Sequence, residues 1–360
     1  MRTHTWNAIA FVTTWLMVLS LAGCGSNSRA GRDGFTVGLL LPSQGISRWE
    51  HSDRPLIEKR LKELCAHCTI AFANAENDAT RQRQQMHSMI VKGTAVLILD
   101  AVDPKALRSS VRAAHTAGIP VVAYDRLAEG PISAFVTFNG GQVGRLQGEA
   151  LLKGMGDKAN GGQIVMMNGD PASPNAAWYA KAALSVIEGK VKIGRSYDTP
   201  GWIAENAHDN MAAAIAALGP DRIDGVLAAN DAIASGVIAA LKNARVRALP
   251  PVTGQDADLD AVRRIVGGEQ YMTVYKPFRT EAAVAAAMAV ALGRGEKLGS
   301  IAPNTIDSAT TRGIPAVLLT PVAVTAGTIG QTLVKEGVYT IDQICTPRLR
   351  PACDKAGLTH

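Results

Sequence analysis

The sequence has no concentration of basic residues of the kind that binds nucleic acid. No run of lysine or arginine exceeds two residues, and no aromatic residues alternate with a basic stripe. The formal net charge of the 360 residues is only +6, whereas a nucleic-acid surface needs its basic residues gathered on one face. We therefore expect no nucleic-acid partner.

Motifs of common α/β enzymes are also missing. The loop after the first predicted strand, residues 40–45, reads Leu-Leu-Pro-Ser-Gln-Gly and lacks the glycine fingerprint of dinucleotide-binding proteins. The candidate site described below has no nucleophile–base pair and no set of metal ligands, and paired aspartates alone do not make a glycosidase. The sequence therefore predicts a protein that is not an enzyme and has no cofactor and no metal.

Charged residues are scarce as well, at 19% of the chain, while hydrophobic residues make up 47%. These values are typical of a globular protein and show no signature of disorder. A chain of 360 residues is too long for one comfortable core and suits two domains.

The N-terminus has the features of an export signal. Arg2 precedes an apolar segment over 6–22, and small residues follow it. Cys24 comes directly after Leu-Ala-Gly, which resembles the bacterial lipobox, in which the cysteine is lipidated and becomes the new N-terminus. An ordinary signal peptide and a transmembrane anchor are the alternatives, although the segment is short for a membrane span. We expect a signal peptide over 1–23, a lipid-anchored tether over 24–34, and a position on the extracytoplasmic face of the cell membrane.

Cysteine is rare, with five in the chain. Four remain once Cys24 is set aside, and an even number in an exported protein favours disulfides. The short separations favour the local pairs Cys65–Cys68 and Cys345–Cys353. A zinc site is the rival interpretation, but the second pair is spaced too widely for a typical zinc-binding pair. A redox-active pair at the first position is a further alternative, which the end of a helix disfavours because it does not promote the thiolate.

Apolar strand patterns alternate with helical patterns of ten to fifteen residues. The first strands are expected over 35–41, 69–73, 95–99, 120–124 and 134–138. This order is typical of right-handed βαβ units around a parallel sheet. The alternation restarts after Asn139, which predicts a second α/β lobe and a cleft between the two lobes. Small ligands usually bind in such clefts.

Polar clusters stand where predicted strands give way to helices. They lie at 42–49, 124–126, 229–231, 253–259 and 274–276. Loops at the carboxyl ends of parallel strands converge on one ligand. Sugar hydroxyls need carboxylates that accept and cations that donate, and the flat apolar faces of the ring suit aromatic plates. The candidate ligand-binding residues are Arg48, Trp49, Asp125, Arg126, Asn175, Trp202, Asn230, Asp256 and Lys276.

Each candidate also has a purely structural interpretation. Asn230 and Asp256 have side chains that favour helix N-cap positions. A tryptophan more often packs in a core or on a surface than against a ligand, but Trp49 follows an arginine in a polar loop. Trp202 follows Pro-Gly, where no face of a helix or strand is expected to bury it. Five loops that all end in this way favour a binding site.

These segments resemble the periplasmic D-xylose-binding proteins of ABC importers, in the ribose-binding superfamily. The resemblance runs from about residue 35 to residue 325, and its most specific motifs are Gly-Gln-Asp-Ala-Asp-Leu at 254–259 and Met-Thr-Val-Tyr-Lys-Pro at 272–277. It implies a type I periplasmic-binding-protein fold, in which two Rossmann-like lobes are joined by a three-segment hinge. It also implies that the nine candidates contact a monosaccharide, which a monomer delivers to the membrane subunits of an ABC permease.

The hinge divides the chain into lobes. The expected lobes are 35–139 with 277–303 at the N-terminal side and 140–276 with 304–360 at the C-terminal side, with crossings near Asn139, Pro277 and Pro303. Lobe closure on the sugar is the expected motion.

Two positions depart from the family pattern. Ser173 stands where an acidic residue is usual, and Asn139-Gly140 stands where Asp-Asn is usual. Glucose, ribose or a pentitol therefore remain beside D-xylose as the ligand. A sensory lipoprotein that presents sugar to a receptor kinase is the alternative to a transport role. A sugar-responsive repressor would need a helix-turn-helix where this chain has a signal-like segment.

Overall fold

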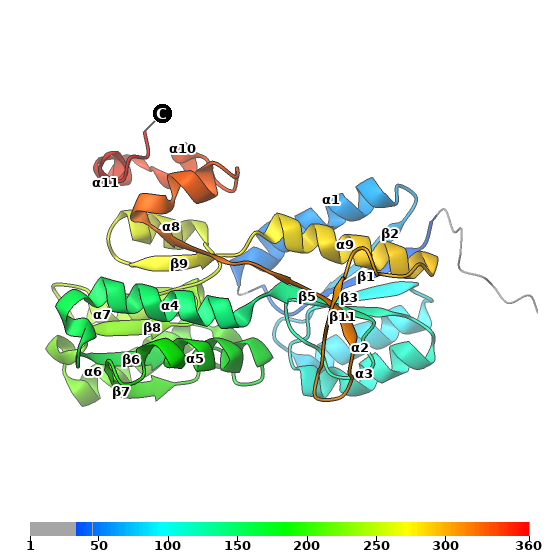
Figure 1. Ribbon diagram of the computed structural model, residues 1–360, viewed down its shortest axis with the longest axis horizontal. Coiled ribbons are helices and arrows are strands. Elements are labelled where there is room, and N and C mark those ends of the chain that lie inside the picture. The colour runs from blue at the N-terminus through cyan, green and yellow to red at the C-terminus, as the bar shows by residue number, and fades with distance from the viewer. Residues whose placement is uncertain (1–33, 45, 360) are drawn as a thin grey trace, which may run out of the picture.

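The computed structural model describes residues 34–44 and 46–359. The expected signal peptide over 1–23, the tether up to residue 33 and the lipidation of Cys24 therefore lie outside the described residues. Within the described part, the chain folds into two α/β lobes that lie side by side (Figure 1). No helix in this part combines the length and the apolar character that crossing a membrane requires.

The first lobe is built on a seven-stranded sheet with the order β10-β11-β5-β4-β3-β1-β2. Its strands are β1 (Thr36–Leu41), β2 (Thr69–Asn74), β3 (Val96–Leu99), β4 (Val121–Tyr124), β5 (Ala134–Phe138), β10 (Asn304–Ile306) and β11 (Ile314–Leu319). Its helices are α1 (Arg54–Leu64), α2 (Ala79–Val91), α3 (Pro104–Thr116) and α9 (Phe278–Arg294). All neighbouring strands are parallel except β10 and β11. Helices α1 and α9 cover one face of the sheet, and α2 and α3 cover the other (Figure 1).

The second lobe has a parallel three-stranded sheet, β7-β6-β8, and an antiparallel pair, β9 and β12. Its strands are β6 (Gln163–Met167), β7 (Lys192–Tyr197), β8 (Gly225–Ala228), β9 (Met272–Tyr275) and β12 (Val322–Thr325). Its helices are α4 (Gly140–Met155), α5 (Pro174–Ile187), α6 (Ala204–Leu218), α7 (Asp231–Asn243) and α8 (Leu259–Val266). Next to β8, Val252 forms only a single parallel bridge, to Val226. Prolines at 250 and 251 explain this, because proline has no N–H to donate to a ladder.

The expected lobe boundary at residue 303 is wrong, because the sixteen residues that follow it belong to the first lobe. β11 pairs with β5, with Ala316 opposite Phe135 and Leu319 opposite Phe138, so 304–319 belong to the first sheet. The chain crosses to the second lobe only after Leu319, on its way to β12 (Figure 1). The physical reason is that β5 would otherwise be an open edge, which an apolar strand such as β11 covers.

Local sequence signals set the helix starts. Asp103 accepts hydrogen bonds from the backbone N–H groups of Lys105 and Ala106, and Pro104 occupies the first turn of α3, where its missing N–H costs nothing. Asp78 caps α2 in the same way. These caps end the preceding loops sharply, so the polar residues of those loops stay at the carboxyl edge of the sheet.

The two cysteine pairs expected from their spacing are bonded in the structure. Cys65–Cys68 joins the end of α1 to the start of β2, and Cys345–Cys353 lies in the C-terminal segment, defined here as residues 326–359. This segment contains α10 (Ile341–Ile344) and α11 (Arg350–Lys355). It packs against α8 through a buried apolar cluster.

Candidate functional site

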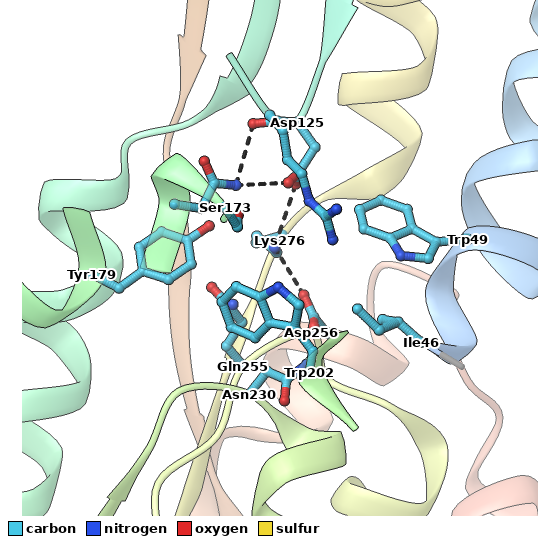
Figure 2. Close-up of a pocket in the computed structure, with 12 residues that line it drawn as sticks. Ile46, Trp49, Asp125, Ser173, Tyr179, Trp202, Asn230, Gln255, Asp256 and Lys276 are labelled. Atoms are coloured by element: carbon cyan, nitrogen blue, oxygen red, sulfur yellow. Dashed lines mark hydrogen bonds and ion pairs between the residues drawn. The ribbon is translucent and has the colours of Figure 1, made fainter. Parts of the chain in front are cut away.

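A small cavity lies between the lobes, where loops leave the carboxyl ends of the strands. Its lining comes from both lobes and consists of Ile46, Trp49, Asp125, Arg126, Ser173, Asn175, Tyr179, Trp202, Asn230, Gln255, Asp256 and Lys276 (Figure 2). The space around these side chains, open solvent included, amounts to about 260 Å³. Small ligands usually bind in such sites between domains.

Eight of the nine residues expected from the sequence line this cavity, and the ninth, Arg48, lies behind its wall. The guanidinium of Arg48 donates to both carboxylate oxygens of Asp53, at 2.9 and 2.6 Å. It also donates to Glu281, at 2.7 Å, and to Asp125, at 2.9 Å. Arg48 therefore orients the carboxylate of Asp125, which lines the cavity. The other N–H groups of Arg48 donate to residues outside the cavity.

The electrostatics of this arginine follow from its partners. Burial alone would lower the pKa of Arg48, but the carboxylates of Asp53, Glu281 and Asp125 raise it above its usual value. The ring of Trp49 lies 4.1 Å from the guanidinium carbon, and that of Phe278 lies 4.3 Å from it. The guanidinium thus lies over aromatic rings, and its N–H groups donate to carboxylates.

Lys276 connects the carboxylates of the two lobes. Its Nζ lies 2.8 Å from Oδ1 of Asp256, as an ion pair without hydrogen-bond alignment, and 3.6 Å from Oδ2 of Asp125 (Figure 2). Burial opposes the charge of Lys276, yet Asp256 raises its pKa above the usual value, so the ammonium is kept. Burial also opposes the charge of Asp125, but Lys276 and Arg48 lower its pKa. The cavity therefore holds fixed charges of both signs.

The other polar candidates have backbone or side-chain partners that fix them. Asn175, in the first turn of α5, donates to Oδ1 of Asp125 across the lobes at 2.7 Å. Asn230 is the N-cap of α7, as its structural interpretation predicts, and still lines the cavity. Asp256 is not a cap, because α8 begins after Asp258. Arg126 donates to the backbone oxygen of Ala101 at 3.2 Å.

Both tryptophans are buried at the cavity wall, with Trp49 2% and Trp202 5% exposed. The expectation that no structural face would bury Trp202 is therefore wrong, since it belongs to a large apolar cluster while it also lines the cavity. Gly169 makes this position possible: a Cβ there would lie 2.0 Å from the Trp202 ring. One face of the ring is thus fixed by backbone.

Several unpaired polar atoms lie in the cavity lining. The indole nitrogens of Trp49 and Trp202, Oγ of Ser173 and Oε1 of Gln255 are buried without a hydrogen-bond partner among the residues that the structure describes. Buried polar atoms are normally paired, so a group of unpaired ones at one cavity indicates hydrogen-bonding capacity for a ligand. Two are donors only, one accepts only and a hydroxyl does both, which suits a polyol.

Strained backbone gathers at the same place. Asp125, Trp202, Asp256 and Ala257 all have positive φ, at 56°, 58°, 98° and 54°. Non-glycine residues rarely adopt this conformation, and it persists where surrounding structure holds it, often at ligand sites.

Sequence reasoning missed Ile46, Tyr179 and Gln255 as lining residues. Gln255 directly precedes Asp256 in the loop already selected, and Tyr179 is four residues after Asn175 on α5, so it shares a helix face with it. These positions could have been found, whereas nothing in the sequence distinguishes Ile46. Within the described residues, no group of His, Cys, Asp or Glu side chains is arranged to hold a metal ion.

Two α/β lobes with a polar cavity between them define a class of ligand-binding proteins. The chain matches the family described as periplasmic binding protein domain over residues 37–297. It therefore belongs to this family of binding proteins, which are not enzymes.

The relatives of the chain extend over nearly its whole length. It is 33% identical to the D-xylose-binding periplasmic protein of Escherichia coli (strain K12), over 84% of this chain and 90% of the relative. It is 30% identical to the multiple sugar-binding periplasmic receptor ChvE of Rhizobium radiobacter, over 86% and 92%. A crystal structure of an ABC transporter solute-binding protein from Clostridium phytofermentans with bound β-D-glucose superposes with a TM-score of 0.78, at 30% identity, over 86% of this chain and 99% of that one.

Proposed function

We propose that this protein is the extracytoplasmic substrate-binding lipoprotein of an ABC importer, and that it captures D-xylose or a closely related pentopyranose between its lobes. One observation carries the proposal: the cavity between the lobes is lined by two indole rings, cations and carboxylates contributed by both lobes. A pyranose ring has flat apolar faces and a rim of hydroxyls, and both features have counterparts in this lining.

The division of the contacts between lobes supports capture by closure. Asp125 and Trp49 come from the first lobe, whereas Trp202 and Asp256 come from the second. A ligand that contacts both sets favours the closed arrangement by its differential affinity for it. Small-angle scattering should therefore report compaction at saturating sugar, and an unchanged radius of gyration would contradict closure.

The transport role rests on the family and on the relatives. A binding protein that holds sugar without chemical change needs a partner that moves it, and the membrane subunits of an ABC permease are the proposed partner. Lipidation at Cys24 would keep a monomer at the outer face of the membrane. A sensory role for the same binding event would be separated from transport by deletion of the permease, which should abolish sugar uptake only in the first case.

Glucose is the second candidate ligand, because the solute-binding protein from Clostridium phytofermentans contains β-D-glucose at 30% identity. Ser173 supports glucose too, because a serine is smaller than the acidic residue of the xylose-binding pattern and carries no charge, which leaves more room for a larger sugar. Ribose and pentitols remain further alternatives.

The test is calorimetry with D-xylose, D-glucose, D-ribose and xylitol. We expect micromolar or tighter binding of D-xylose, and its loss in Asp256→Ala and Trp202→Ala. Saturation by another of these sugars, with no heat from D-xylose, would contradict D-xylose as the ligand. The proposal that the protein captures a sugar would still stand. No heat from any of them would contradict the proposed function.

A further inference from the structure

The loop that carries Asp256 into the cavity is held in an unfavourable backbone conformation. Asp256 and Ala257 are consecutive, neither is glycine, and both have positive φ. Such a conformation persists only where neighbouring groups fix it. The groups that fix this loop therefore determine where the Asp256 carboxylate lies.

Two of these groups belong to β9. The N–H of Asp256 donates to the backbone oxygen of Val274 at 2.9 Å. The N–H of Ala257 donates to the hydroxyl of Thr273 at 3.1 Å. β9 thus supplies the acceptors for the N–H groups of Asp256 and Ala257. The donor for the carbonyl oxygen of Ala257 comes from another element.

A further group comes from the C-terminal segment. The hydroxyl of Tyr339 donates to the backbone oxygen of Ala257 at 3.0 Å. Tyr339 is 82 residues away in the chain, so this contact exists only because the segment is folded back onto the second lobe. Burial raises the pKa of its hydroxyl, with nearby Asp258 and Asp231 acting in the same direction, so the proton that it donates is retained.

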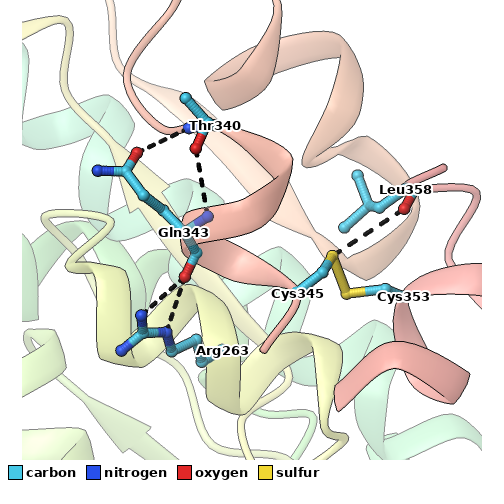
Figure 3. Close-up of a disulfide and its surroundings, with 6 residues drawn as sticks. All are labelled: Arg263, Thr340, Gln343, Cys345, Cys353 and Leu358. Atoms are coloured by element: carbon cyan, nitrogen blue, oxygen red, sulfur yellow. Dashed lines mark hydrogen bonds between the residues drawn. A yellow bond between two sulfur atoms is a disulfide. The ribbon is translucent and has the colours of Figure 1, made fainter. Parts of the chain in front are cut away.

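The C-terminal segment is itself anchored near this contact. Immediately after Tyr339, the hydroxyl of Thr340 and the side chain of Gln343 cap α10 reciprocally (Figure 3). The guanidinium of Arg263, on α8, donates twice to the backbone oxygen of Gln343, at 3.0 and 2.7 Å. Arg263 therefore ties α10 to the helix that follows the Asp256 loop.

The disulfide closes the same unit. Cys345 follows α10 directly and is bonded to Cys353 on α11 (Figure 3). Both cysteines are buried in the apolar cluster that also contains Ala257. A segment this short buries little surface of its own, so a covalent link contributes substantially to its order.

From this geometry we propose that Tyr339, held by the disulfide-bonded C-terminal segment, is a positioning residue for Asp256. The inference deepens the proposed sugar site, because it assigns the geometry of a ligand-contacting carboxylate to a segment outside the cavity. Tyr339 acts through the carbonyl of Ala257 and does not touch the ligand.

The first test does not depend on the sugar. Hydrogen–deuterium exchange of the exported protein should show the amides of Asp256 and Ala257 exchanging about 2- to 12-fold faster in Tyr339→Phe, the factor that corresponds to the net effect of one neutral hydrogen bond. Tyr197→Phe, on the edge strand β7, is the matched control and should leave the loop unchanged. Unchanged exchange in Tyr339→Phe, or faster exchange throughout both lobes, would overturn the proposal.

The second test measures affinity for D-xylose and D-glucose by calorimetry. Tyr339→Phe should weaken the binding of whichever sugar the wild type binds by a similar factor, and this effect should vanish when Asp256 is already Asn. An equal effect in both backgrounds would contradict a role through Asp256. If the wild type binds neither sugar, the proposed ligand fails, while the exchange result still decides the role of Tyr339.

The disulfide provides the third test. Replacing Cys345 and Cys353 by Ser should accelerate exchange in the Asp256 loop, whereas replacing Cys65 and Cys68 by Ser, in the first lobe, should not. Equal behaviour of the two double variants would remove the disulfide from the proposal. If the first variant does not fold, Tyr339→Phe remains the deciding variant.

Discussion

Arg48 and Glu281 are 233 residues apart in the sequence, yet their side chains meet at 2.7 Å and are almost completely shielded from solvent, at 1% and 0% exposure. Arg48 precedes the short helical turn at Trp49–Asp53, and Glu281 lies in the first turn of α9, immediately after the chain has returned from the second lobe. The pair therefore joins the wall of the cavity to the segment that connects the lobes.

This pair predicts a pH dependence of stability. Burial raises the pKa of Glu281 well above its usual value, and the neighbouring Asp125 and Asp53 raise it further, against the opposing effect of Arg48. Glu281 therefore keeps its proton in the folded protein over a range of pH, above about 4.3, in which the unfolded chain has already released it, and it is a carboxylate paired with Arg48 only above that range. The stabilisation is complete below that pH and is lost as the pH rises through the folded pKa.

We expect Glu281→Gln to flatten this dependence, because an amide keeps the shape and does not titrate. Denaturant unfolding between pH 5 and pH 8 should show a smaller loss of unfolding free energy with rising pH in the variant than in the wild type. Glu205→Gln, at an exposed position on α6, is the control for loss of one negative charge. A variant with an unchanged slope would contradict the raised pKa.

The contact between Gly169 and Trp202 predicts a cost for a single methyl group. Gly169→Ala places a Cβ where the indole now lies, 2.0 Å from its nearest atom, so the ring must move. Overpacking of this kind costs about 1–3 kcal/mol, and the displaced ring should lower sugar affinity about tenfold or more. Thermal unfolding and calorimetry measure the two effects. Gly299→Ala, which meets no atom within 4 Å, should change neither.

Asp256 is the carboxylate whose loss should weaken sugar binding most directly. A charged hydrogen bond contributes about 1.5–3 kcal/mol, so Asp256→Asn should raise Kd by about one to two decades. Asp209→Asn, at a highly exposed position on α6, removes the same charge without touching the cavity. Equal affinities of Asp256→Asn and the wild type would remove Asp256 from the site.

Anchoring is tested separately, because Cys24 lies outside the described residues. Cys24→Ser should release the protein from membrane fractions into the soluble fraction and leave sugar affinity unchanged. Retention on membranes after a high-salt wash would contradict a lipid anchor at this cysteine.

Much of the fold follows from local patterns in the sequence. Strands such as β1 are continuous apolar runs because both faces of a parallel sheet are covered by helices. Polar residues at the ends of such runs therefore identify the cavity-facing loops, and this is why most candidates meet at one place. The sequence pattern predicts the neighbourhood of Arg48, but the role of this residue behind the cavity wall depends on Glu281, which no local pattern connects to it.

The errors have a common origin in long-range pairing. Nothing in the short strand 314–319 specifies that it pairs with β5 rather than with a strand of the second lobe, so the sequence pattern predicts the third crossing too early in the chain. The burial of Trp202 depends on a glycine 33 residues earlier, which a pattern of neighbouring residues cannot reveal. The contact of Tyr339 with the Asp256 loop is hidden for the same reason.

The pairing of β5 with β11 also has a mechanical consequence. Two of the three chain crossings start from adjacent strands, and the N–H of Asn139 donates to the oxygen of Leu319 at 2.8 Å where they leave the sheet. This hydrogen bond joins the two crossings, so we expect them to bend together and the crossing at Pro277 to bend separately. The joined crossings and the crossing at Pro277 are two pivots, and two pivots define one axis. We therefore expect the lobes to open and close by a hinge rotation about that axis.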